Sequence, residues 1–301
     1  MISICIPVYN VNITSLVLEL EIQINQSDSE VELIVIDDRS LDKVRNQNNS
    51  CLKRHVYIKL NKNVGRSRIR NMFLDYSKYD NLLFLDCDVE VIKENFLVNY
   101  IKALKHNPCD VVCGGLEYSK VKPLKENVLR WKFGSQRECR AVALRNENPY
   151  ASFMTSNFII KKKMLLLNPF DENLTKYGHE DTLLGFQLRL AGKKILHIQN
   201  PVLHADVESN VNFLNKTEIA IQNLIVVYNT VELKKEFSNS VKLLKFTSTI
   251  EKYNLNKWIL LFFKILRKPV FSLLKKGYTC RLFFFDFYKL GLTCYYKNKI
   301  N

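Results

Sequence analysis

The chain has 301 residues, of which 47% are hydrophobic and 25% are charged, with only 9 glycines and 7 prolines. This length and composition allow a large buried core without disulfide or metal staples, and they exclude a disordered, collagen-like or linker-rich protein. The formal net charge of +15 favours an anionic neighbour, of which lipid headgroups and nucleic acid are the usual ones.

The charge is concentrated toward the C-terminus, and the cysteines are scattered. Residues 241–301 contain thirteen Lys or Arg against Glu251 and Asp286, which leaves a net charge of +11 there. The eight cysteines include no CxxC pair, and the chain opens on MISICIPVYN without the basic and apolar regions of a signal peptide. We therefore expect a protein of the reducing cytoplasm, with no stretch apolar enough to cross a bilayer.

The first 115 residues alternate short apolar runs with longer amphipathic segments. The apolar runs predict strands over residues 2–8, 31–36, 56–60, 81–85 and 110–114. The spacing of apolar residues between them predicts helices over residues 13–26, 66–76 and 96–106. Strands that alternate with helices in short units indicate a parallel sheet with helices on both faces.

The second half of the chain is less regular. Residues 157–164 predict a strand that ends in a basic turn, and residues 182–191 predict an amphipathic helix with Gly192 as its C-cap. Residues 195–198 predict a short strand. Beyond Asp206 the apolar spacing is helical and lysines alternate with apolar clusters, so we expect a mainly helical C-terminal region.

Polar residues follow each of the first four predicted strands. They are Tyr9 and Asn10, Asp37 and Asp38, Asn63 and Gly65, and Asp86 and Asp88. Right-handed crossovers bring the carboxyl ends of parallel strands to one edge of the sheet, and ligands bind in the crevice outside that edge. We therefore expect these four loops to form one cleft.

Asp86 and Asp88 are the first candidates for chemistry. Carboxylates two apart at a strand end lie on the same side of the chain and repel each other, and Mg²⁺ prefers one or two carboxylates together with phosphate oxygens and water. The alternative is an acidic loop start without a metal. The sequence has no GxGxxG after the first strand and no P-loop motif, so a metal on this pair would have to meet the charge of a bound diphosphate.

Three further features have both a chemical and a structural interpretation. Glu180 and Asp181 begin a predicted helix, where acids complement the helix dipole, but an ionised Asp there can also accept a hydroxyl proton as a general base. His204 follows a predicted strand end and is either a ligand for Mn²⁺-like ions or a structural residue. Asp38 accepts hydrogen bonds from a nucleobase or ribose, or forms an Asx turn. By contrast, we expect His197, within an apolar run, in the core.

Residues 130–157 contain further candidates for ligand contact. They are Trp131 and Tyr150 as stacking aromatics, Arg137, Arg140 and Arg145 as partners of an anionic group, and Asn157 as a polar contact, while His179 lies beside the acids at 180–181. The alternative is that the aromatic residues pack in the core and the arginines are solvated.

Five motifs occur in order along the chain. They are PVYN at 7–10, IDDRS at 36–40, NVGRSRIRN at 63–71, LDCD at 85–88 and GHEDTLLGFQLRLAGKK at 178–194. This series resembles the family 2 glycosyltransferases of the GT-A fold, over residues 1–210. The resemblance implies an α/β fold with a GT-A type, Rossmann-like mixed sheet flanked by helices, and a mainly helical, basic C-terminal extension. The implied domains are a glycosyltransferase domain over residues 1–212, with a nucleotide-binding half (1–115) and an acceptor half (116–212), and a C-terminal region over residues 213–301.

The resemblance also implies an activity. Such enzymes bind a nucleoside-diphosphate sugar, here expected to be a UDP-sugar, together with Mn²⁺ or Mg²⁺, and transfer the sugar with inversion to a hydroxyl group. We expect a glycan or lipid-linked acceptor, in surface polysaccharide or glycoconjugate synthesis. Residues 130–157 would then form part of the acceptor wall, with the arginines there as partners of an anionic acceptor such as a lipid pyrophosphate.

The resemblance assigns roles to the matching positions. The nucleotide-sugar-binding residues would be Pro7, Tyr9, Asn10, Asp38, Asn63, Gly65, Arg70 and Asp86. The metal ligands would be Asp86, Asp88 and His204, the general base Asp181 with Glu180 beside it, and the acceptor contacts His179, Asn157 and Trp131.

Two positions depart from the family pattern. Arg39 stands where the usual DDGS motif has glycine, and Ile69 stands where the usual ARN motif has alanine. Neither change touches the implied chemistry, but Arg39 is expected to alter the rim of the nucleotide pocket.

The C-terminal region contains two apolar clusters with basic flanks, residues 258–263 and 282–285. Such clusters suit a bilayer interface, and they equally suit a helical subdomain with a lysine-covered surface. We expect peripheral attachment at the inner membrane face, near a lipid-linked acceptor.

Two other functions are compatible with parts of the sequence. A nucleotidyltransferase would need a glycine-rich, basic loop after the first strand, which PVYN lacks. A nucleic-acid binder using the basic tail would leave the acidic pairs unexplained, because they repel phosphates without a metal. No nucleic-acid partner is therefore expected, and the sequence does not indicate an oligomeric state.

Overall fold

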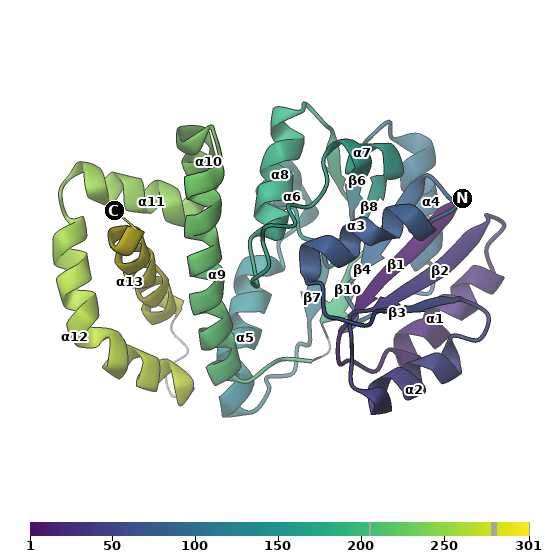
Figure 1. Ribbon diagram of the computed structural model, residues 1–301, viewed down its shortest axis with the longest axis horizontal. Helices are drawn as coiled ribbons and strands as arrows, with labels where there is room; N and C mark the ends of the chain where they lie inside the picture. Colours follow the sequence, from purple (N-terminus) through teal and green to yellow (C-terminus); the bar gives the residue numbers. More distant parts are fainter. Residues whose placement is uncertain (205, 278–281, 301) are drawn as a thin grey trace. The chain divides into compact units, whose positions relative to one another are not determined.

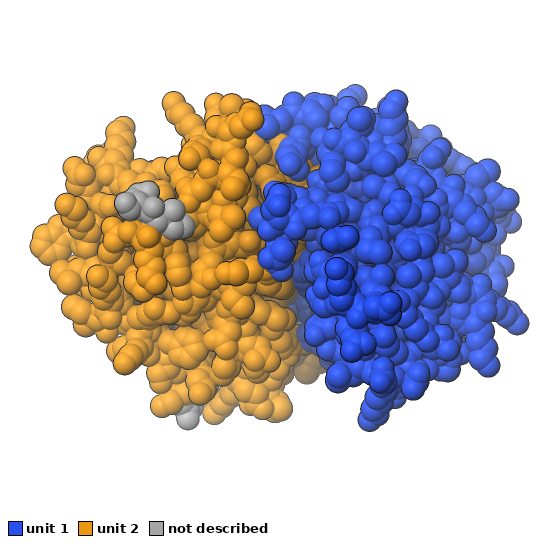
Figure 2. All heavy atoms as spheres, viewed as in Figure 1, with its two compact units in different colours: residues 1–119, 138–175, 187–206 blue, residues 120–137, 176–186, 207–301 orange. Residues whose placement is uncertain are grey.

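The computed structural model describes residues 1–204, 206–277 and 282–300. The chain divides into two compact units, coloured separately in Figure 2. Unit 1 comprises residues 1–119, 138–175 and 187–206, and unit 2 comprises residues 120–137, 176–186 and 207–301. The chain therefore passes between the units more than once, and the predicted boundary at residue 212 falls inside a helix of unit 2.

Unit 1 is built on a seven-stranded sheet with the order β3-β2-β1-β4-β8-β6-β9 (Figure 1). Its strands are β1 (Ile2–Val8), β2 (Val31–Asp37), β3 (Val56–Lys59), β4 (Asn81–Leu85), β6 (Val111–Cys113), β8 (Asn157–Lys161) and β9 (Ile195–His197). Strands β1 to β4 pair in parallel, whereas β8 is antiparallel to both β4 and β6. The sheet is thus mixed, as the resemblance implied, and the purely parallel sheet expected from the alternation of elements is wrong at β8.

The central strands are buried because they are covered on both faces, which is why they read as continuous apolar runs. Nearly every residue of β1 is inaccessible to solvent. Pro7 is tolerated in this strand because pairing with β4 stops at Cys5, so its missing N–H interrupts no bond on that side. The sheet therefore holds the ends of β1, β2 and β4 as a rigid edge.

Helices flank the sheet. They are α1 (Thr14–Asn25), α2 (Asp42–Cys51), α3 (Arg66–Tyr76), α4 (Phe96–His106), α6 (Val142–Glu147) and α7 (Lys162–Leu167). Helix α1 packs against α2 and α4, whereas α3, which crosses in front of the strands in Figure 1, packs against α7. The predicted helices over 66–76 and 96–106 are confirmed to the residue, but α2 was not predicted, and the basic run after β8 begins helix α7 and not a turn.

A second, three-stranded sheet with the order β5-β10-β7 lies at the end of β4. Its strands are β5 (Val89–Glu90), β7 (Leu116–Tyr118) and β10 (Val202–His204). Strand β5 begins directly after Asp88 and pairs antiparallel with β10, so that Val89 lies opposite His204. This small sheet brings residues more than a hundred positions apart to the same place.

Unit 2 is helical, as expected for the C-terminal region. It contains a 3₁₀ turn (Lys125–Asn127), α5 (Val128–Phe133), a π-helical turn that begins at Gly134 (Gly134–Glu138), the start of α8 (Glu180–Leu190), α9 (Asn210–Thr230), α10 (Lys234–Ser240), α11 (Lys242–Lys252), α12 (Asn256–Lys275) and α13 (Leu282–Ile300). Its core is formed by apolar faces of α5, α9, α12 and α13 around residues such as Phe213, Phe263 and Tyr288. In the described part of the chain, no helix combines the length and the apolarity that a bilayer crossing requires.

Candidate functional site

The loops after β1 and β2 are hydrogen-bonded to each other. The Asn10 N–H donates to Ser40 Oγ, and Asn10 Oδ1 accepts from the Leu41 N–H, both at 2.8 Å. The Asp38 N–H also donates to the Val8 carbonyl at 2.8 Å. These reciprocal bonds make the two loops one rigid element beyond the sheet edge.

Two residues of these loops have left-handed backbone conformations. Asn10 has φ 56° and Arg39 has φ 69°. Asn adopts this region readily, whereas an arginine there costs about 1 kcal/mol or more. The turn is held by the Asp37 carboxylate, which accepts the Ser40 N–H at 2.8 Å. The glycine of the usual DDGS motif therefore corresponds to a conformation that suits glycine, and Arg39 adopts it with an exposed side chain.

Asp38 fixes the loop after β3. Its two carboxylate oxygens accept the N–H groups of Val64 and Gly65 at 2.6 and 3.0 Å. The Asn63 side chain donates to the Asp38 carbonyl at 3.1 Å. Burial raises the pKa of Asp38, and these two N–H groups oppose the rise. The Asp38 carboxylate therefore joins the loop after β2 to the loop after β3, and its backbone N–H joins the same residue to the end of β1.

Arg70 neutralises Asp86. Its Nη2 lies 2.7 Å from Asp86 Oδ1, and the guanidinium is only 2% exposed. A second bond from Arg70 reaches the Arg66 carbonyl at 3.2 Å, and the guanidinium lies over the Phe170 ring at 5.7 Å. Of the two aspartates in the acidic motif, Asp86 is therefore the one that is paired with a buried arginine side chain.

Asp88 faces His204. Asp88 Oδ2 lies 3.9 Å from His204 Nε2, and the imidazole stacks on Tyr118 with ring centroids 5.1 Å apart. His204 Nδ1 is buried and has no hydrogen-bond partner among the residues that the structure describes. Burial and the neighbouring Asp86 raise the pKa of Asp88, while His204 and Arg66 oppose the rise. The pairing of β5 with β10 thus brings together two of the three predicted metal ligands.

The distance between these two groups suits a shared ion better than a direct hydrogen bond. Two ligands that each lie about 2.1 Å from one ion are about 3.0–4.2 Å apart, depending on the angle between them. The observed 3.9 Å falls in this range. Within the described residues, no group of three or more His, Cys, Asp or Glu side chains is arranged to hold one ion. The spacing of Asp88 and His204 is therefore compatible with one shared ion.

Cys87, between the two aspartates, serves packing. Burial together with Asp88 and Asp86 raises the pKa of its thiol to about 12, while the nearby Tyr9 backbone N–H opposes the rise. The thiol therefore stays protonated. The Tyr9 ring itself is 53% exposed, which leaves an aromatic face accessible at the edge of the site.

Glu180 and Asp181 differ in exposure at the start of α8. Glu180 is buried, with 5% of its surface exposed, whereas Asp181 is partly exposed and accepts the Thr182 N–H at 2.6 Å. His179 precedes them with φ 70° and contacts Thr182 Oγ1 at 3.1 Å. Burial lowers the pKa of His179 to about 4. The helix start therefore presents one accessible carboxylate beside a neutral imidazole.

The structure does not support a direct acceptor contact for Asn157. The side chain is 2% exposed. Its Oδ1 accepts the Tyr100 hydroxyl at 2.6 Å, and its Nδ2 donates to the carbonyls of Gly115 and Asn200, both at 2.9 Å. Because these bonds use the whole amide group, Asn157 joins β8 to two neighbouring segments and has no group left for a ligand.

Arg145 and Tyr150 are also structural. Arg145 is buried and donates to the Ile198 carbonyl at 2.9 Å and to His197 Nδ1 at 3.2 Å. The Tyr150 hydroxyl donates to the Lys193 carbonyl at 3.0 Å. His197 lies in the core as expected, with burial as the main cause of a pKa lowered to about 4. The expected contact of Arg145 with an anionic acceptor is therefore wrong, whereas stacking of the partly exposed Tyr150 ring on a sugar stays a prediction.

The other acceptor candidates occupy different surroundings. Trp131 is half-buried on α5. Arg137 is exposed and pairs with Asp286 of α13 at 3.0 Å, and Arg140 donates to Ser152 Oγ at 3.2 Å. Contact of Trp131 with an acceptor stays a prediction.

Two residues of the site were not singled out from the sequence. Arg66, at the start of α3, is close enough to lower the pKa of Asp88, and its signal was present in the NVGRSRIRN motif. Tyr118 stacks on His204 through the pairing of β7 with β10. No local pattern indicates that pairing, because it joins segments far apart in the sequence.

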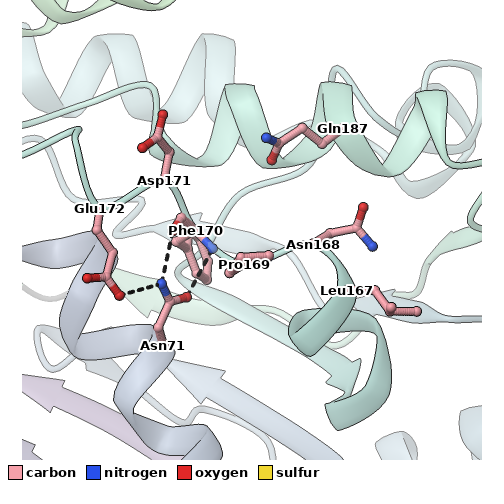
Figure 3. A pocket seen from close by; sticks show the side chains of 8 residues that line it. All are labelled: Asn71, Leu167, Asn168, Pro169, Phe170, Asp171, Glu172 and Gln187. Atoms are coloured by element: carbon pink, nitrogen blue, oxygen red, sulfur yellow. Dashed lines mark hydrogen bonds between the residues drawn. The ribbon is translucent and has the colours of Figure 1, made fainter.

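Two surface pockets of unit 1 are lined by other residues. One of about 480 Å³ lies beside α3, and Figure 3 shows how Asn71 closes it by donating to the Phe170 carbonyl at 2.9 Å and to Glu172 at 3.0 Å. Another of about 770 Å³ is lined by α4 and the segment 198–199. The asparagine of the usual ARN motif thus holds the segment 170–172 in place.

Comparison with solved structures shows the fold. The chain is similar to the mannosyltransferase PcManGT from Pyrobaculum calidifontis, solved with GDP-Man and Mn²⁺, with a TM-score of 0.61 and 15% identity over 100% of this chain and 86% of that chain. It is also similar to glucosyl-3-phosphoglycerate synthase from Mycobacterium tuberculosis, solved with Mg²⁺ and UDP (TM-score 0.53, 17% identity, 75% and 78% covered).

A third similar structure is TarS of S. aureus, with a TM-score of 0.51 and 17% identity over 96% of this chain and 54% of that one. At these identities the likeness shows a common GT-A fold. No curated protein matches the sequence.

The family follows from the sequence itself. Residues 3–165 match the model of "Glycosyl transferase family 2", a segment that contains the loops after β1 to β4 and four of the five motifs. The match favours a sugar transferase over the nucleotidyltransferase and nucleic-acid binder considered above. Because it spans more than half of the chain, the protein belongs to glycosyl transferase family 2 and is a glycosyltransferase.

Proposed function

We propose that this enzyme transfers a sugar, with inversion, from a nucleoside-diphosphate donor to a hydroxyl of a glycan or lipid-linked acceptor, and that the reaction requires Mn²⁺ or Mg²⁺. A UDP-sugar is the donor we expect. The enzyme would act in surface polysaccharide or glycoconjugate synthesis, in the cytoplasm at the inner face of the membrane.

The observation that carries this proposal is the joining of four strand-end loops around Asp38 and the acidic motif. Asp38 holds the β3 loop and its N–H is bound to β1, while Arg70, on the helix that follows the β3 loop, binds Asp86 after β4. In a sheet of this type the crevice outside the carboxyl ends of the strands binds the ligand. The exposed ring of Tyr9 and the carboxylate of Asp38 are suited to the base and ribose of a nucleotide.

The residues present fit a divalent cation. The Asp88 carboxylate and the Nε2 atom of His204, 3.9 Å apart, are groups of the type that bind Mn²⁺. Asp88 and His204 would hold the ion, while Asp86 is neutralised by Arg70. When bound, the ion would stabilise the negative charge of the leaving diphosphate as a Lewis acid. The complexes of PcManGT with Mn²⁺ and of the glucosyl-3-phosphoglycerate synthase with Mg²⁺ support the same assignment.

Inversion needs one base that takes the acceptor proton. We assign that role to Asp181, because its carboxylate is partly exposed, whereas Glu180 is buried. Asp181 would accept the proton of the acceptor hydroxyl as the hydroxyl oxygen attacks the anomeric carbon. The sugar–phosphate bond would break as the new glycosidic bond forms. His179, kept neutral by burial, would help to orient the acceptor.

A thermal-shift panel tests the donor and metal assignments. The full chain is heated with UDP-, GDP- and CDP-sugars, each with Mn²⁺, with Mg²⁺ or with a chelator. We expect one nucleotide class to raise the melting temperature only when the cation is present. Equal stabilisation with and without cation, or none by any donor, would contradict the proposal. The anomeric configuration of the product, read by NMR, separately tests inversion.

A further inference from the structure

Helix α12 exposes a continuous apolar stripe. Five side chains one turn apart along the helix are between 40% and 65% exposed: Trp258, Leu261, Phe262, Ile265 and Leu266. This spacing, i, i+3, i+4, i+7 and i+8, defines one face of a helix. Single exposed apolar residues are ordinary on a protein surface, but an aligned row of large ones marks a binding surface. We call these five residues the α12 stripe.

A row of lysines runs along the same helix. Lys257, Lys264, Lys268 and Lys275 are exposed and follow one another at intervals of seven, four and seven residues, which places them on one line beside the α12 stripe. The helix contains no Asp or Glu. Within the described part of the chain, no carboxylate pairs with these four lysines. The basic residue that is paired, Arg267, binds Glu218 at 2.6 Å on another side of the helix.

The opposite side of α12 is anchored in unit 2. Phe263, Val270 and Leu274 are buried in the core of the unit. Gly291 of α13 lets the Phe263 ring approach so closely that a Cβ there would lie 2.0 Å from it. Figure 1 shows α12 beside α13 within this unit. Because the inner face is fixed, the α12 stripe and the lysine row are held outward together.

The second apolar cluster expected from the sequence is mostly core. Leu282 and Phe285 of α13 are 7% and 1% exposed and belong to the core of unit 2. Phe283 is the exposed member, at 73%. An interfacial role for residues 282–285 as a cluster is therefore wrong, and α12 is the helix with a complete amphipathic outer face.

The combination of an apolar stripe and a lysine row indicates which kind of partner would bind this face of α12. Two copies of the chain meeting face to face would bring their lysine rows together, and like charges repel. A nucleic acid would meet the lysines but leave the aliphatic side chains facing phosphate and water. An anionic bilayer surface satisfies both, because acyl chains receive the apolar side chains and headgroups receive the lysines.

We propose that the outer face of α12 docks the enzyme on an anionic lipid bilayer, with the helix lying along the interface and the lysine row at the level of the headgroups. The inference deepens the proposed function, because a membrane-docked enzyme would meet a lipid-linked acceptor at the surface. Docking itself depends only on the contacts of α12 and not on the donor site.

Vesicle sedimentation tests the proposal with the full chain. Vesicles of phosphatidylcholine alone are compared with vesicles of equal parts phosphatidylcholine and phosphatidylglycerol, at low and high salt. We expect binding to the anionic vesicles, weakened by salt. In a Trp131→Phe background, the emission of Trp258 should shift to shorter wavelength on binding, since its ring would leave water.

Matched pairs of variants locate the contact. Lys264→Gln with Lys268→Gln should weaken vesicle binding about 25-fold, at about fivefold for each lysine, whereas Lys234→Gln with Lys235→Gln on α10 should not. Phe262→Ser with Ile265→Ser should weaken it about tenfold or more. Leu166→Ser, at a leucine 59% exposed in unit 1, is the apolar control. Circular dichroism checks that each variant is folded.

Three results would overturn the inference: no binding to either vesicle, equal binding by the α12 variants and the wild type, or a dimer in solution that Ile265→Ser dissociates. The donor panel is run on the same variants. If the donor still stabilises the protein in the presence of the cation but vesicle binding is lost or absent, only the docking proposal is affected. If no donor stabilises the wild type, the proposed function itself is contradicted.

Discussion

Asp86 and Asp88 are two residues apart, and their surroundings give them different properties. Asp86 forms an ion pair with the buried guanidinium of Arg70 at 2.7 Å. Removing one partner of such a pair costs about 3–5 kcal/mol, because a charge is left without compensation. Asp88 has an imidazole as its neighbour at 3.9 Å and remains 38% exposed. One aspartate therefore stabilises the fold, and the other is accessible to a ligand.

Asp88→Asn should abolish the cation-dependent part of donor binding. An amide is a far weaker ligand than a carboxylate for Mn²⁺ and leaves His204 as the single strong donor. We expect the donor Kd with Mn²⁺ to rise at least tenfold, to the value measured with chelator, as read by isothermal calorimetry. Asp75→Asn, at an exposed aspartate of α3, is the control. A variant at Asp88 that retains the full effect of Mn²⁺ would remove this residue from the metal site.

Asp181→Asn should separate catalysis from donor binding. The amide keeps the size of the side chain but cannot take a proton, and loss of a general base lowers the rate by about 10²–10⁴-fold. We expect kcat to fall by that factor while the donor-induced rise in melting temperature is unchanged. Turnover close to the wild-type value would exclude Asp181 as the base. Glu180→Gln should instead lower stability, because Glu180 is buried.

For single residues, the motifs predicted the position in the fold more accurately than the role of the side chain. Asp38, Asn63 and Gly65 were expected around one cleft, and they are hydrogen-bonded to one another. Asn157 was expected at a ligand and is instead consumed by three partners within the fold. An amide has the same hydrogen-bonding groups in either role, so the sequence alone could not distinguish them.

Two residues before helix α8 lies a glycine that contacts a neighbouring helix. Gly178 has φ 95°, and a Cβ there would lie 2.7 Å from Ala220 Cβ on α9. The Asn223 side chain of α9 donates to the Gly178 carbonyl. Helix α9 therefore fixes the turn that carries His179, Glu180 and Asp181.

Gly178→Ala should impair catalysis more than its cost in stability suggests. The left-handed φ alone costs about 1 kcal/mol, and the contact with Ala220 would in addition displace the start of α8. Gly192→Ala is a matched control, since Gly192 lies after the end of the same helix with φ 64° and has open space around it. We expect both variants to lose stability in urea unfolding, but only Gly178→Ala to lower kcat. Equal kcat in the two variants would contradict a positioning role for this turn.

Elements with an apolar period were predictable, and elements made by tertiary pairing were not. Helices α3 and α4 match their predicted bounds because their apolar residues recur at helical spacing. Helix α2 has the sequence DKVRNQNNSC and a single buried residue, Asn48, so it leaves no apolar pattern. Strands β5 and β7 are two and three residues long and exist through their pairing with β10.

At the scale of the whole chain, the distribution of charge indicated a separate C-terminal region, and packing shows which of its surfaces are buried and which are exposed. The excess of basic residues after residue 241 lies in the helices of unit 2, which have a core of their own. The sequence could not separate the cluster at 258–263 from that at 282–285, because both combine large apolar residues with lysines. Only packing decides that α13 turns Phe285 inward while α12 keeps Phe262 outward.

The stability of the whole molecule should fall as the pH is lowered from about 6.5 to about 4. Burial lowers the pKa of His197 and of His179 from 6.5 to about 4. In this window the unfolded chain binds protons on these imidazoles that the folded chain does not, so stability rises with pH. For His197, which is 2% exposed, the full effect is on the order of 3 kcal/mol.

His197→Gln isolates this contribution to the pH dependence. The variant should be less stable near neutral pH, because the imidazole accepts a bond from Arg145 and donates one to the Pro149 carbonyl at 2.9 Å. Its melting temperature should nevertheless fall less steeply between pH 6.5 and 4, since glutamine does not titrate, and the two profiles should converge toward the acid end. His106→Gln, at an exposed position of α4, should follow the wild-type profile. Parallel profiles for the wild type and His197→Gln would mean that the buried imidazole is already charged in the folded chain, and that Arg145 is oriented by some other group.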